Sequence, residues 1–135
     1  MFSLVKINQG RINQPEPEFL TVGATYAVNK GDALVLSSGL LVPSGTDTDG
    51  VAPKYIAMAN AAVSTVCPVC RITPEMLWET TFSASAASIK VGDKVTLNAS
   101  SNHVIGVTAT TTKGVATVAE MFGTASGATV HVRFE

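Results

Sequence analysis

The chain has 135 residues, of which 46% are hydrophobic and 14% charged, and its formal net charge is -1. This length suits a single domain with a buried core, and the composition is that of a folded chain. The near-neutral charge without a basic run argues against nucleic acid as a partner, and the lack of an apolar stretch of about 18 residues argues against a membrane span. The low charge content indicates that part of the surface faces other protein.

Residues 1–18 differ from the rest of the chain, because they are rich in Asn and Gln and contain Pro15 and Pro17. Each proline disfavours helix at its own position and at the residue before it. We therefore predict an extended N-terminal arm with a short strand at residues 3–7, and a frayed terminus is the alternative. The arm is too apolar for a purely solvated tail, since it carries Phe2, Leu4, Val5, Ile7 and Ile12.

From residue 19 onward, short runs rich in Val, Thr and Ala alternate with turn signals such as "KGD", "SSG" and "VGD". This rhythm predicts an all-β domain over residues 19–135, either a small barrel or a sandwich. The segment "ATVHVRF" alternates cleanly and places Val130 and Val132 on one face and His131 on the other. Strands are expected at 20–28, 33–37, 40–43, 54–60, 63–73, 77–82, 94–98, 104–109, 114–121 and 128–134.

The sequence contains an internal repeat. "NKGDALVLSSG" is followed by the similar "KVGDKVTLNASSN", and sixty-one positions separate Gly31 from Gly92. A second match aligns "CRIT" with the terminal "VRFE", which gives Cys70 the place of Val132. We predict two related halves, residues 19–73 and 80–135, that share one core either face to face or edge to edge.

The repeated Gly-Asp pairs, Gly31 with Asp32 and Gly92 with Asp93, are predicted to be structural turns. Glycine accepts positive φ, and the aspartate side chain can accept hydrogen bonds from nearby backbone amides. Turn chemistry is favoured over a ligand role at these four positions.

The motif "CPVC" places Cys67 and Cys70 at a spacing used by zinc and redox sites. A zinc site needs about four ligands, and the sequence has no second cysteine pair. On a strand, residues three apart point to opposite faces, so the two thiols are predicted to be buried apolar side chains. Two cysteines are too few for a disulfide framework, which favours synthesis in a reducing cytoplasm. No metal and no other cofactor is expected.

No motif of the sequence indicates an enzyme. His103 and His131 have no sequence neighbours that suggest a catalytic triad, and the acidic residues form no evident catalytic pair. Trp78 lies in the connector between the halves. It is predicted to belong to the core, with an anchor in a protein interface as the alternative.

The repeated segments "GDALVLSSGLLVP" and "VGDKVTLNASSNHVIGVTATTTKGVATV", with the terminal "GATVHVRF", resemble the barrel-type capsid decoration (cement) proteins of tailed bacteriophages. The resemblance covers most of residues 19–135. This chain departs from that family by its longer apolar N-terminal arm and by its CxxC motif.

This resemblance implies a structural virion protein on the outer surface of a phage capsid, where it binds the major capsid protein and braces neighbouring subunits. It also implies a homo-oligomer, with a trimer favoured. We expect the arm to bind the capsid through its apolar residues, and deletion of residues 1–14 to abolish binding while the body stays folded. A head-fibre or tail-associated protein is one alternative, and a small carbohydrate-binding β-module is another.

Overall fold

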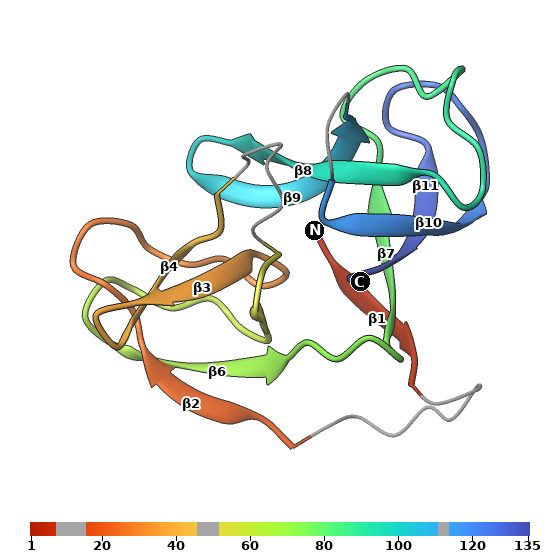
Figure 1. Ribbon diagram of the computed structural model, residues 1–135. Coiled ribbons are helices and arrows are strands. Elements are labelled where there is room, and N and C mark those ends of the chain that lie inside the picture. The colour runs from red at the N-terminus through yellow and green to blue at the C-terminus, as the bar shows by residue number, and fades with distance from the viewer. Residues whose placement is uncertain (8–15, 46–51, 111–113) are drawn as a thin grey trace.

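The computed structural model describes residues 1–7, 16–45, 52–110 and 114–135. Within these ranges the chain forms strands and turns but no helix. The described residues therefore contain no helix long and apolar enough to cross a membrane. The strands form two sheets whose ladders are antiparallel (Figure 1). The predicted all-β class is therefore confirmed. Of the two expected architectures, the sandwich fits, because neither sheet closes into a barrel.

The first sheet is built by the N-terminal half. Its order is β2-β6-β5-β3-β4. The strands are β2 (Glu18–Thr21), β3 (Ala33–Ser37), β4 (Leu40–Pro43), β5 (Tyr55–Ala57) and β6 (Val66–Arg71).

The second sheet is built by the C-terminal half, with one added strand. Its order is β1-β7-β11-β10-β8-β9. The strands are β1 (Ser3–Lys6), β7 (Leu77–Thr81), β8 (Lys94–Ser100), β9 (His103–Ala109), β10 (Ala116–Met121) and β11 (Thr129–Arg133). Without β1, each half contributes five strands that follow the same order. The internal repeat of the sequence is therefore a repeat of the fold.

The two halves also share their hairpins. Tight turns with consecutive positive φ angles join β3 to β4 through Ser38 and Gly39, and β8 to β9 through Ser101 and Asn102. Two residues with positive φ suit the right-handed twist of the strands on either side. Both turns correspond to the Ser-rich signals of the sequence.

The buried apolar residues form two core clusters. The smaller cluster contains eight residues, all from the N-terminal half. Strand pairing, and for Val28 the 61-residue offset of the repeat, gives each of the eight a C-terminal counterpart in the larger cluster, which also holds Ala33, Ile56 and Cys70. The pairs are Val22 and Phe82, Val28 and Ile89, Leu34 and Val95, Leu41 and Val107, Tyr55 and Ala116, Ala57 and Val118, Cys67 and Val130, and Val69 and Val132.

This arrangement revises the expectation of one shared core, because the larger cluster joins residues of both halves while the smaller cluster belongs to the N-terminal half alone. Each half curls until its first strand meets its third, as the parallel bridges Val22–Leu41 and Phe82–Val107 record. The inner face of each sheet is therefore covered by its own half. The halves meet through residues on the outer face of the first sheet, including Ala33, which join the larger cluster.

The register of the second sequence match is also corrected by one residue. Ala57 pairs with Val69, and its counterpart Val118 pairs with Val132. Val69 is therefore the structural counterpart of Val132, and Cys70 is not. The sequence alignment slipped because thirteen residues lie between the paired Val118 and Val132, whereas eleven lie between the paired Ala57 and Val69.

Candidate functional site

The predicted N-terminal arm is part of the folded body. β1 pairs with β7, with Leu4 opposite Trp78. Phe2 is 2% exposed, its N–H donates to the carbonyl of Gly31 at 3.0 Å, and its ring lies 5.5 Å from that of Phe134. A deletion of residues 1–14 would therefore remove core packing, and it cannot separate capsid binding from folding.

The remaining apolar residues of the arm are placed as follows. Leu4 and Ile7 are partly buried against the larger core cluster, and Val5 is half-buried. Ile12 lies outside the residues that the structure describes. Capsid binding by these side chains stays a prediction, and Phe2 is available to a partner only where it lines a groove.

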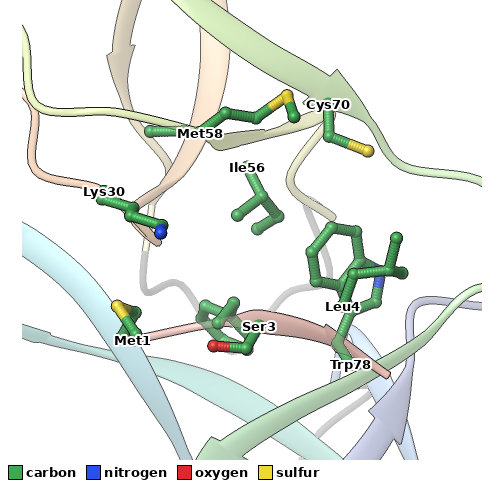
Figure 2. Close-up of a pocket in the computed structure, with 10 residues that line it drawn as sticks. Met1, Ser3, Leu4, Lys30, Ile56, Met58, Cys70 and Trp78 are labelled. Atoms are coloured by element: carbon green, nitrogen blue, oxygen red, sulfur yellow. The ribbon is translucent and has the colours of Figure 1, made fainter. Parts of the chain in front are cut away.

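That groove lies between β1 and the outer face of the first sheet, with a volume of about 410 Å³. Figure 2 shows Met58 and Ile56 facing Met1 and Leu4 across it. The residues that line it are Met1, Phe2, Ser3, Leu4, Lys30, Ile56, Ala57, Met58, Cys70 and Trp78. It is a junction between the two halves, built by segments that are far apart in the sequence.

The chemistry of the groove is that of a binding surface for apolar groups. Ile56 and Trp78 are buried and belong to the larger core cluster. Met58 is only partly buried, and methionine adapts its shape to a bound group. Lys30 adds a cationic side chain to the lining. The groove therefore fits an apolar side chain of a partner with an acidic or carbonyl group beside it.

Cys70 lines this groove but is not a reactive thiol. Desolvation, and then the negative charge of Glu18, raises the pKa of Cys70 to about 11. Desolvation also raises the pKa of Cys67. Both thiols are free and buried, in different core clusters on opposite faces of β6. The described residues contain no group of side chains able to hold a metal ion.

Trp78 is buried between the halves, at the start of β7. Its indole N–H has no hydrogen-bond partner within the described part of the chain. The ring packs inside the chain and reaches the groove, so the core prediction describes its position better than a surface anchor does.

The two Gly-Asp pairs form matching turns. Gly31 and Gly92 have φ angles of 87° and 95°, and both donate their N–H to the facing strand at 2.8 Å. The Asp32 carboxylate accepts from the N–H of Asn29 at 2.8 Å, and Asp93 accepts from Lys90 at 2.9 Å. All four residues serve the turns that the sequence predicted for them.

Asp32 has a further contact that its counterpart lacks. Nδ1 of His103, from the β8–β9 hairpin, lies 2.7 Å from Asp32 Oδ2. Asp32 is almost fully buried, and His103 is about three-quarters buried. This pair ties the two halves together. No sequence signal could have predicted the contact between Asp32 and His103, because the two residues are 71 positions apart and no repeated motif includes His103.

A second polar cluster lies on the outer face of the second sheet. Nε2 of His131 is 3.0 Å from a carboxylate oxygen of Glu79, and Nδ1 is 3.4 Å from one of Glu120. The ring of Phe122 stands edge-on at 4.8 Å. The alternation of "ATVHVRF" placed His131 on the face opposite Val130, but it gave no sign of the two carboxylates.

The equivalent face of the first sheet is apolar. Phe19 is opposite Pro68 in the ladder, as Glu79 is opposite His131. Phe19 is 66% exposed, and Val66 on the same face is 60% exposed. The outer face of the first sheet is therefore more apolar at this position than that of the second sheet.

A comparison of the sequence with models of known protein families gave no match, and a comparison with curated proteins gave no similar sequence.

Proposed function

We propose that this chain is a capsid decoration protein, which binds the outer surface of a phage capsid and stabilises contacts between capsid subunits. The resemblance of its repeated segments to that family and its low charge content support the proposal. It acts as a binding protein whose partner is the major capsid protein.

The single observation that carries the proposal is the apolar groove beside β1. A partner side chain that enters it would contact Leu4 of β1, Met58 of the N-terminal half and Trp78 of β7. The contact removes apolar surface from water, which contributes roughly 25 cal/mol per Å².

Bracing then follows from geometry. A copy that engages two capsid subunits at once makes the second contact at a high effective concentration. Its contacts must break before the two subunits can separate. Modest individual contacts are therefore enough to raise the resistance of the shell to heat and internal pressure.

The test uses capsids assembled from the major capsid protein encoded in the same genome as this chain. We expect the full-length chain to co-sediment with these particles to saturation and to raise their melting temperature. Met58→Glu should weaken binding at least about tenfold, because a carboxylate would lose its hydration in an apolar groove. Val91→Glu is the matched control, since Val91 is 62% exposed and outside the groove.

Two results would contradict the proposal. If the native chain does not associate with the particles, it is not a decoration protein of that capsid. If Met58→Glu and Val91→Glu bind as the native chain does, the groove is not the binding site. Electron microscopy of native particles separates this proposal from a head-fibre or tail location.

A further inference from the structure

The groove beside β1 has a strand edge as one of its walls. β1 is the terminal strand of the second sheet and pairs with β7, where Leu4 lies opposite Trp78. Among the described residues, no strand pairs with the other side of β1. That side borders the groove, and Figure 2 shows Met1, Ser3 and Leu4 along it.

The bond of Phe2 shows which backbone groups of β1 point toward the groove. Its N–H donates to the carbonyl of Gly31, on the side of the chain away from β7. Gly31 follows Lys30, which lines the groove. Backbone groups of an extended chain point to alternate sides, so the N–H and C=O of Leu4 point the same way as those of Phe2.

The ladder of the second sheet gives the same orientation independently. The carbonyl of Val118 accepts from the N–H of Gly92 at 2.8 Å, on the side of β10 away from β11. The pair Val118–Val132 is therefore non-bonded, and the next pair across the sheet, Val132–Trp78, is bonded. It follows that Leu4–Trp78 is non-bonded, so both backbone groups of Leu4 are left for the groove side.

Trp78 contributes a third unused hydrogen-bonding group. The residue is 2% exposed, and its indole N–H has no partner in the described part of the chain. Figure 2 shows the indole nitrogen on the side of Leu4. Buried donors are rarely left without an acceptor, so a carbonyl oxygen that enters the groove would satisfy this N–H.

The other end of the groove is cationic. Figure 2 shows Lys30 beside Met1, across the groove from Trp78, and Lys30 forms no ion pair with a described residue. Ile56 and Met58 supply apolar side chains between the two ends. A wall of free backbone groups beside apolar side chains is the arrangement by which sheet edges bind extended peptides.

We propose that the groove binds an extended peptide segment of a partner protein, which adds to β1 as a further strand. The N–H and C=O of Leu4 pair with its backbone, and one of its carbonyls accepts from Nε1 of Trp78. An apolar side chain of the segment packs on Met58, and a carboxylate lies near Lys30. The inference rests on the proposed function only for the source of the segment, which is then the major capsid protein.

Selection of random peptides of about seven residues on the immobilised full-length chain tests the binding mode. We expect enriched peptides in which apolar residues alternate with others and an acidic residue is present. They should bind the native chain at least about tenfold more tightly than Met58→Glu, because the new carboxylate loses hydration in the groove.

NMR of the ¹⁵N-labelled chain with a selected peptide reports on the two proposed contacts. Trp78 is the only tryptophan, so the chain has a single indole N–H resonance, which should shift when a carbonyl accepts from it. The backbone amide of Leu4 should exchange at least about tenfold more slowly in the complex than in the free chain.

Leu4→Pro tests the backbone bond directly. Proline lacks the N–H, but that group is not used in the ladder with β7, and edge strands accept proline at such positions. Leu4→Ala is the matched reference, because it also loses the leucine side chain and keeps the N–H. We expect Leu4→Pro to bind a selected peptide at least about tenfold more weakly than Leu4→Ala. Circular dichroism checks that both variants fold.

Three results would overturn the proposal. The first is a selection in which no enriched peptide prefers the native chain to Met58→Glu. The second is a bound peptide that changes neither the exchange of the Leu4 amide nor the Trp78 indole resonance. The third is equal binding by Leu4→Pro and Leu4→Ala. Because these tests need no capsid, their failure is distinct from that of the proposed function.

Discussion

The two halves of the molecule have the same strand order and the same buried positions, but their outer faces differ in chemistry. At one ladder position the N-terminal half has Phe19 opposite Pro68, and the C-terminal half has Glu79 opposite His131. Core positions must stay apolar to keep each half folded, whereas outward positions are free to diverge. The divergence therefore leaves the N-terminal half with an apolar outer face at a position where the C-terminal half has a charged one.

The N-terminal strand makes the halves unequal in a second way. β1 completes the edge of the C-terminal half and packs Phe2 into the larger core cluster. It also crosses the Gly31 turn of the N-terminal half, where Phe2 donates to the Gly31 carbonyl. The segment expected to be a free arm therefore joins the two halves.

The largest expected effect concerns this strand. Phe2→Ala should lower the free energy of unfolding by about 4 kcal/mol, because it leaves a cavity between the halves. Phe19→Ala should change it by less than about 0.5 kcal/mol, since that ring is exposed. Urea denaturation in dilute solution measures both. Equal effects of the two substitutions would show that β1 does not pack as described.

The next largest effect is a pH dependence of the free energy of unfolding, which reports whether Cys70 is buried at the junction between the halves. The folded state raises the pKa of Cys70 from 9.0 to about 11, so the native chain keeps a proton that the unfolded chain loses. This contribution to stability is present below pH 9.0 and is lost as the pH rises toward about 11. The loss is on the order of 2 kcal/mol.

Cys70→Ala should remove this part of the alkaline loss, as urea denaturation at about pH 8 and about pH 10.5 would show. Val69→Ala is the control, because it shortens a buried side chain on the same strand without removing a titrating group. If Cys70→Ala keeps the native pH dependence, the thiol is not desolvated between the halves.

The smallest effect compares the two Gly-Asp turns. Gly92→Ala should lower the free energy of unfolding by about 1 kcal/mol, because its φ of 95° is strained for a residue with Cβ. A Cβ at this position meets no atom within 4 Å, so backbone strain is the whole effect. Gly31→Ala should cost about 2 kcal/mol, because its Cβ would also collide with the side chain of Met1. Thermal unfolding of the two variants measures the difference. Equal losses would mean that the N-terminal strand does not cover the Gly31 turn.

Much of the fold could be predicted from the sequence. The ranges expected for β3 and β4 match the observed strands, because alternation and turn residues are local signals. The Gly-Asp turns repeat with identical backbone contacts for the same reason. The burial of Cys67 and Cys70 on opposite faces follows from the period of a strand.

The candidate site could not be predicted in this way. The groove joins Leu4, Met58 and Trp78, which no local pattern relates. The contact of His103 with Asp32 joins the two halves in the same way. Such contacts depend on how complete sheets pack, and a pattern of neighbouring residues does not carry that information.

The sequence by itself determined the all-β class, the duplication and the turns, because each depends on residues close together in the chain or on a direct repeat of them. The tertiary structure alone decided that one core cluster belongs to the N-terminal half, that the larger cluster joins both halves, and that β1 joins the second sheet. These features depend on the curl of each sheet and on which distant apolar faces pack together. The free energy gained by burying apolar surface depends on the area removed from water and not on the distance between the residues in the sequence.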